Sequence, residues 1–321
     1  MIAPTTSIRE PALFSRLRDS KHVLVAGAGQ GFDIFAGLPI ALALQAAGKR
    51  VSFANLSFAH LSNTSAEWLH PNLAVVTPET TGQDRHFPER ALAQWLSQQG
   101  TPATVFAFEN VGLRPLTLAY RALCGHLRPD AIVLVDGGTD LLMFGDEAGL
   151  GTPQEDMVSL AAIAALDVPQ RLVACIGFGV DSHHGVCHAH FLENVATLER
   201  EGAYLGSFSV PRHSSEGARF LEAIRFAQAA TPARPSIVNG SIAAALEGHF
   251  GDAHFTERTA GTELFINPLM GLYFTFDLPS LARRSLYLPL LEETDTHYQV
   301  GRVNEGFRDT IEWRPRRAIP H

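Results

Sequence analysis

The stretch HVLVAGAGQGFDIFAGLPIALALQAAG, residues 22–48, decides the fold class. Residues 22–28 form a continuous apolar run with the length of a buried strand. A glycine-rich turn follows, and the apolar segment 33–47 is long enough for a helix that ends before Gly48, as helices commonly do. A buried strand, a tight turn and a helix in this order are typical of an α/β protein with a parallel sheet.

The same alternation continues along the chain. Further strands are predicted from apolar runs over residues 51–58, 73–78, 104–109, 131–138, 171–179, 203–210 and 235–240. Helices are predicted over 88–100, 114–127, 153–166, 187–202 and 215–230, with Thr152 as an N-cap and Glu155 completing a capping box. The predicted fold class is α/β, a doubly wound, mostly parallel Rossmann-like sheet with helices on both faces.

The sequence predicts a single α/β domain over residues 1–313. Its last part, about 250–313, is less regular and is expected to form a C-terminal cap. This part contains the strand-like run 263–266, the aromatic run 272–276 and the apolar run 286–291. Residues 314–321 are expected to be a flexible tail.

Composition excludes several classes of protein. Of the 321 residues, 46% are hydrophobic and 18% charged, which allows a large core and excludes a disordered chain. The net charge of −8, without a basic cluster, argues against a nucleic-acid partner. Three scattered cysteines predict a reducing, cytoplasmic setting. No apolar run reaches about 18 residues, so no membrane partner is expected. The sequence does not determine the oligomeric state, and a homo-oligomer remains an alternative.

Polar residues follow many of the predicted strands, where parallel sheets bind their ligands. The predicted substrate-binding residues at these strand ends are Gly29, Gly31, Asp33, Asn55, Glu109, Gly137, Gly138 and Asn239. Asp33 alternatively only caps the first helix. The glycine spacing is GxGxG, Phe32 occupies the place of the last glycine of the dinucleotide pattern, and the second strand ends at Asn55 instead of an acid. NAD(P) hydride chemistry is therefore disfavoured.

The loop DGGTDLLMFGDEAGLGTPQED, residues 136–156, holds the densest group of carboxylates. Asp136 and Asp140 are predicted to be catalytic, because carboxylates at a strand end hold divalent cations or orient a water molecule. A divalent metal ion is therefore an optional cofactor. The alternative for the remaining acids of the loop, Asp146, Glu147, Glu155 and Asp156, is that they are surface and helix-cap charges.

Four histidines and Cys187 lie within residues 182–190. Their spacing fits no specific zinc pattern, and the rings of His188 and His190 leave a helix on different faces. His184 or His188 is predicted to act as an acid or base. The alternative is an exposed histidine-rich turn, and the sequence does not decide between these two residues and their neighbours His183 and His190.

The motifs GAGQGFD, DGGTD, GDE and LGTPQED, with further stretches over about 20–295, resemble an uncharacterised family. That family is described as a domain of unknown function with members in archaea, bacteria and fungi. The resemblance implies one compact α/β unit and assigns no activity.

We expect an enzyme of hydrolase or lyase type that acts on a small polar metabolite such as a nucleoside, nucleotide or sugar derivative. The alternative is a nucleotide-binding regulatory module without turnover, which would keep the glycine loop and need no carboxylate cluster. The enzyme hypothesis makes one spatial prediction. Asp33 and Asp136, about 100 residues apart in the chain, should line the same cleft.

Overall fold

The computed structural model describes residues 7–83, 86–261 and 263–319, and their strands form one sheet in the order β3-β4-β5-β2-β1-β6-β7-β9-β8. The five central strands are parallel: β5 (Val105–Phe108), β2 (Arg50–Leu56), β1 (His22–Gln30), β6 (Ala131–Asp136) and β7 (Gln170–Cys175). Both flanks are antiparallel: β3 (Glu67–His70) and β4 (Leu73–Val76) on one side, β9 (Leu272–Asp277) and β8 (Tyr204–Ser209) on the other. The predicted α/β class is confirmed, and the sheet is mixed with a parallel centre.

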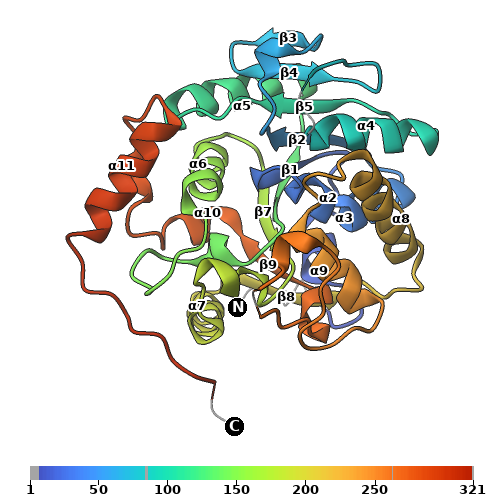
Figure 1. The fold of residues 1–321 in the computed structure, drawn as a ribbon. Helices are drawn as coiled ribbons and strands as arrows, with labels where there is room; N and C mark the ends of the chain where they lie inside the picture. The colour runs from blue at the N-terminus through green and yellow to red at the C-terminus, as the bar shows by residue number, and fades with distance from the viewer. Residues whose placement is uncertain (1–6, 84–85, 262, 320–321) are drawn as a thin grey trace.

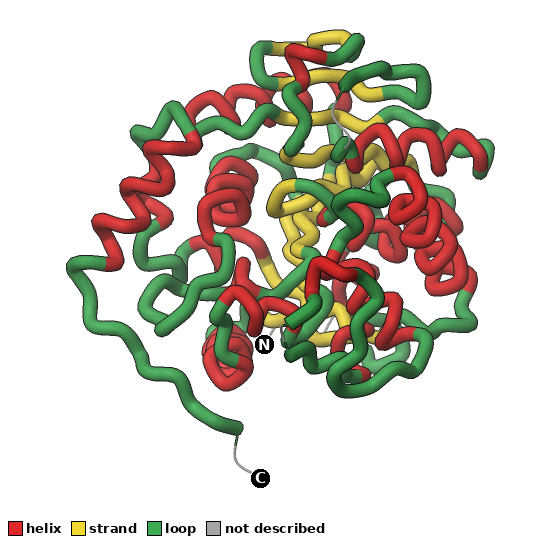
Figure 2. Tube along the Cα trace, in the orientation of Figure 1, coloured by secondary structure: helices red, strands yellow, loops and turns green. Residues whose placement is uncertain are grey.

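Helices pack on both faces of this sheet (Figure 1). Strand β1 shows why, because Leu24 and Ala26 point into one hydrophobic core while Val23 and Val25 point into the other. The helices over the first core include α5 (Leu113–Leu127), α6 (Pro153–Ala164), α7 (His188–Arg200), α10 (Leu278–Ala282) and α11 (His297–Arg308). Those over the second include α1 (Ala12–Arg16), α2 (Asp33–Ala36), α3 (Leu38–Ala46), α4 (Pro88–Gln98) and α8 (Ser215–Ala230). Figure 2 shows the strands as a layer between these two groups.

Several predicted elements differ from the structure. The strand-like run 263–266 forms only an isolated bridge at Ile266, and the end of the run 286–291 is a 3-10 helix, Leu288–Leu291. The helix expected over 33–47 is divided at Gly37, and Pro39 at the start of α3 has no N–H with which to continue the hydrogen-bond ladder. The strand expected over 235–240 is wrong. Its residues enter helix α9 (Ile237–Leu246), because the Ser236 hydroxyl accepts a hydrogen bond from the Asn239 amide and caps the helix.

The C-terminal region is more ordered than predicted. Helix α11 starts with a capping box formed by Thr296 and Gln299. The tail, residues 314–319, forms no helix but contacts the body of the molecule. Arg314 binds the carboxylates of Asp146, Glu147 and Glu193 at 2.7–2.9 Å and fastens the tail to the body. Residues 320–321 lie outside the described part of the chain. No helix among the described residues is long and apolar enough to cross a membrane.

Candidate functional site

A cavity of about 290 Å³ opens at the carboxyl ends of the parallel strands. The loop after β1, the end of β6 and the segment after β7 contribute to its walls, as expected for an α/β sheet. Its acidic lining residues are Asp33, Asp136, Asp140, Glu155, Asp156 and Asp181, and its basic ones include His86, His183, His184, Arg234 and Arg258.

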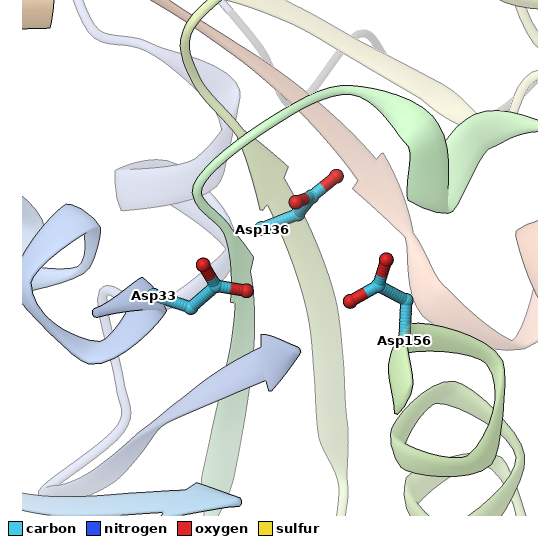
Figure 3. A group of neighbouring side chains, drawn as sticks. All are labelled: Asp33, Asp136 and Asp156. Carbon is cyan, nitrogen blue, oxygen red and sulfur yellow. The ribbon is translucent and has the colours of Figure 1, made fainter. Parts of the chain in front are cut away.

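Three carboxylates meet at the floor of this cavity. Asp33 begins α2, Asp136 ends β6, and Asp156 lies in the first turns of α6. Figure 3 shows the three side chains as neighbours, with Asp33 and Asp156 extending toward each other and the Asp136 carboxylate between and above them. One oxygen from each carboxylate lies within 4.8 Å of the other two, which is close enough for all three to bind one metal ion. Asp33 and Asp136 therefore line the same cleft, as the sequence predicts.

The backbone holds two of the three carboxylates in place. The Gly29 amide donates to Asp33 Oδ2 at 2.8 Å, and the Leu141 amide donates to Asp136 Oδ2 at 3.2 Å. Asp156 is only 2% exposed and has no hydrogen-bond or ion-pair partner among the described residues. A buried carboxylate without a partner is costly, so this side chain is suited to receive a ligand.

Asp140 and Asp181 are fixed by threonines beside the floor. Asp140 Oδ2 accepts hydrogen bonds from the Thr152 amide at 2.6 Å and from its hydroxyl at 2.9 Å. Asp181 Oδ2 likewise accepts from the Thr139 amide at 2.6 Å. The predicted capping box is therefore wrong. The Thr152 hydroxyl binds Asp140, and Glu155 lines the cavity instead of capping α6.

Burial raises the pKa values of the acidic residues in and beside the floor. Burial raises the pKa of Asp33 to about 7, while the Gly29 amide lowers it and the charge of Asp140 raises it. Burial, followed by the charges of neighbouring carboxylates, raises the pKa values of Asp136, Asp156 and Asp181 well above the usual range. The charges that shift these pKa values most are all carboxylates, and no lysine or arginine of the described residues is among them. A bound cation would supply the missing positive charge.

The structure brings most of the predicted site residues to the cavity. Those lining it are Gly29, Gly31, Asp33, Asp136, Gly137, Asp140 and His184. Gly138 packs directly beneath it, where an added Cβ would lie 2.9 Å from both carboxylate oxygens of Asp181. A side chain at Gly138 would therefore displace the carboxylate of Asp181 beside the floor.

Four predicted site residues lie outside the cavity. Asn55 donates to the Gly31 carbonyl at 2.8 Å, and Asn239 donates to the Phe32 carbonyl at 2.9 Å. Both side-chain amides therefore fix the backbone of the loop after β1 from outside the cavity. The other two are Glu109, which lies beyond the end of β5, and His188, whose ring packs on Phe178.

The histidine-rich segment forms no metal site. Among the described histidines, cysteines and acids, only the three aspartates of the floor are close enough to share an ion. His190 Nε2 lies 2.9 Å from the Pro315 carbonyl, and the Cys187 thiol donates to the Arg317 carbonyl at 3.2 Å. These two side chains hold the C-terminal tail, whereas His183 and His184 line the cavity.

Of the remaining lining residues, Arg258 is only a secondary candidate for substrate binding on sequence grounds, Asp156 is expected to be a surface or helix-cap charge, and Arg234 is not predicted at all. A signal for Asp156 was present, since the residues after it, 157–163, are apolar or small on every side of the helix. Such a helix is buried all round, which places the acid at its start in the interior. Arg234 lies outside regular strands and α-helices, and no pattern in the sequence singles it out.

No curated protein and no solved structure matches this chain. The family model described as "Protein of unknown function (DUF1152)" matches residues 24–306, which cover most of the chain and every aspartate of the floor. The chain therefore belongs to the DUF1152 family.

Proposed function

We propose that this protein is a hydrolase of small polar metabolites and that Asp33, Asp136 and Asp156 hold a divalent cation at its active site. The single observation that carries the proposal is the convergence of these three carboxylates at one point of a cavity. Asp156 adds independent support because it is buried and has no partner among the described residues.

The chemistry of the donor set favours a hard cation. Carboxylate oxygens without histidine or thiolate are typical ligands of Mg²⁺, Mn²⁺ and Ca²⁺. Such an ion would offset the charge of the floor and polarise a bond of the substrate. The cavity opens to solvent at His183 and His184, so water is available as the second reactant. His184 is the proposed acid or base at this opening.

We also propose that the fold is the doubly wound, Rossmann-like type. The order β5-β2-β1-β6-β7 of the parallel strands supports this, because the chain moves outward from β1 in both directions. In such sheets the ligand lies where the strand order reverses, here between β1 and β6. Asp33 and Asp136 follow these two strands.

The test is to measure divalent-cation binding and turnover in matched variants. The wild-type protein should be stabilised thermally by Mn²⁺ or Mg²⁺, and Asp156→Asn should lose at least tenfold in cation affinity. Glu89→Gln is the control, since Glu89 is a fully buried carboxylate that lies outside the cavity and accepts hydrogen bonds from Asn55 and Ser57. It should bind the cation as the wild type does.

Turnover is then assayed against nucleosides, nucleotides and sugar derivatives with the cation and with a chelator. The proposal expects hydrolysis that requires the cation and is lost in Asp156→Asn. Unchanged cation binding in Asp156→Asn would overturn the metal site. Nucleotide binding without any turnover would favour a regulatory module instead.

A further inference from the structure

The cavity carries two opposite charges on different walls. The floor is acidic, whereas Arg234 and Arg258 line the same cavity at its exposed side. Neither arginine forms an ion pair with a carboxylate of the described chain, and Arg258 instead donates to the Pro235 carbonyl at 2.6 Å. The acidic and basic walls therefore face one cavity without neutralising each other.

The two arginines make a region of concentrated positive charge. Partial burial and then the charge of Arg234 lower the pKa of Arg258, so the two guanidinium groups repel each other. The neighbouring His86 adds no charge to this pair. Burial and the two arginines lower its pKa to about 4, which leaves the imidazole neutral near pH 7. An anion bound here would gain from both guanidinium groups.

A helix N-terminus adds to this wall. Helix α9 has ten residues, and its first two, Ile237 and Val238, line the cavity beside Arg234. The Ser236 hydroxyl caps the amide of Asn239, so the amides of Ile237 and Val238 precede the first hydrogen bonds of the helix. Free amides and the positive end of the helix dipole both favour an anion at this position.

We propose that this wall is the binding site for a phosphate group of the substrate, which would lie between the arginines and the cation held by the floor. This inference rests on the proposed function, because it needs the cation. A phosphate has enough oxygens to accept from the guanidinium groups and the helix amides while it also binds the cation. Mg²⁺ in proteins is commonly held in this way, by one or two carboxylates together with the phosphates of the substrate.

The inference is tested with inorganic phosphate as the probe, measured by calorimetry on the full chain in the presence of Mn²⁺. Arg234→Ala and Arg258→Ala should each weaken phosphate binding at least tenfold and leave Mn²⁺ affinity within twofold of the wild type. Arg225→Ala is the control, because Arg225 is an exposed arginine of α8 that pairs with Glu247 outside the cavity. It should bind phosphate normally.

Two further arms separate the possible failures. Acetate and malonate should compete poorly with phosphate, and equal competition would replace phosphate by carboxylate as the ligand class. Normal Mn²⁺ binding with no phosphate binding, or arginine variants that bind phosphate as the wild type does, would overturn this inference and leave the proposed function standing. Absence of any cation binding would overturn the proposed function itself.

Discussion

Gly29 shows how closely the backbone approaches the acidic floor. A Cβ atom at this position would lie 2.6 Å from Asp156 Oδ1 and 2.8 Å from Asp33 Oδ2. The glycine is needed for this close approach and not for its conformation, since its φ lies outside the left-handed region. Even the smallest side chain would therefore push the two carboxylates away from their common centre.

Gly29→Ala should lower Mn²⁺ affinity at least tenfold while the protein stays folded, because both displaced oxygens are at the ends of side chains. Cation titration by calorimetry measures this, with circular dichroism as the check on folding. Gly125→Ala is the matched control. Gly125 lies in α5 with nothing within 4 Å of the added Cβ, so alanine should leave cation binding unchanged and stabilise the helix by about 0.5–1 kcal/mol. Equal cation affinity in both variants would contradict the assignment of the floor.

Among the elements, strands of the parallel centre could be predicted and helix α9 could not. The apolar runs that became β1 and β6 are buried on both faces of the sheet, and such burial leaves a clear pattern in the sequence. The start of α9 contains the β-branched pair Ile237 and Val238, and such residues are common in strands. The Ser236 side chain caps a helix at this point instead. The basic wall includes the start of this helix. A strand predicted there gives no indication of a helix N-terminus that faces the cavity.

The C-terminal tail, residues 314–319, is the second element that sequence patterns did not reveal. Its polar, arginine-rich composition is typical of a free end, yet Arg314 lies against Glu147, a carboxylate with no exposed surface. Glu147 also accepts hydrogen bonds from the Phe144 and Gly145 amides at 2.9 Å. The tail therefore helps to hold the loop between β6 and α6, which carries Asp140.

Arg314→Ala should lower the free energy of unfolding by about 2 kcal/mol, because it removes charge-assisted hydrogen bonds from a buried acid. Denaturant unfolding measures the change. Arg302→Ala removes an exposed arginine that pairs with Glu305 along α11, and it should cost less than about 0.5 kcal/mol. If the two variants lost the same small amount, the tail would not support the loop.

For the whole molecule, the acidic floor makes stability depend on pH. The pKa of Asp33 is about 7 in the folded chain, and its ordinary value is 3.8, so the native state binds more protons than the unfolded state. The stability from this proton is fully present below about pH 4 and is lost as the pH rises through 7. The raised pKa values of Asp136, Asp156 and Asp181 act in the same direction.

The melting temperature of the metal-free protein should therefore fall between pH 5 and pH 8, and a divalent cation should restore more of it at pH 8 than at pH 5. Differential scanning calorimetry in chelator and in Mn²⁺ measures both trends. The variant Asp156→Asn should show a smaller fall, since it lacks one buried acid. A melting temperature that stays constant with pH in chelator would mean that the floor does not carry these protons.

The arrangement of charges in the cavity could be predicted from the sequence only in part. Asp33 and Asp136 could be placed together because strand ends of a parallel sheet share one edge. The absence of basic side chains beside these two acids depends on how loops fold over that edge. The position of Arg234 and Arg258 on another wall of the cavity depends on the same loops. No local pattern encodes this arrangement, and only the assembled molecule reveals a cavity with separated charges.

The two walls of the cavity come from different parts of the chain. The acidic wall is built from residues 29–184, and the basic wall from 234–258. The proposed cation ligands and the proposed phosphate contacts thus come from separate segments of the chain. Exchanging only Arg234 and Arg258 for side chains of different charge would keep Asn239, which fixes the loop after β1, and would leave Asp33, Asp136 and Asp156 untouched. The preference for a ligand is then open to redesign at two exposed side chains.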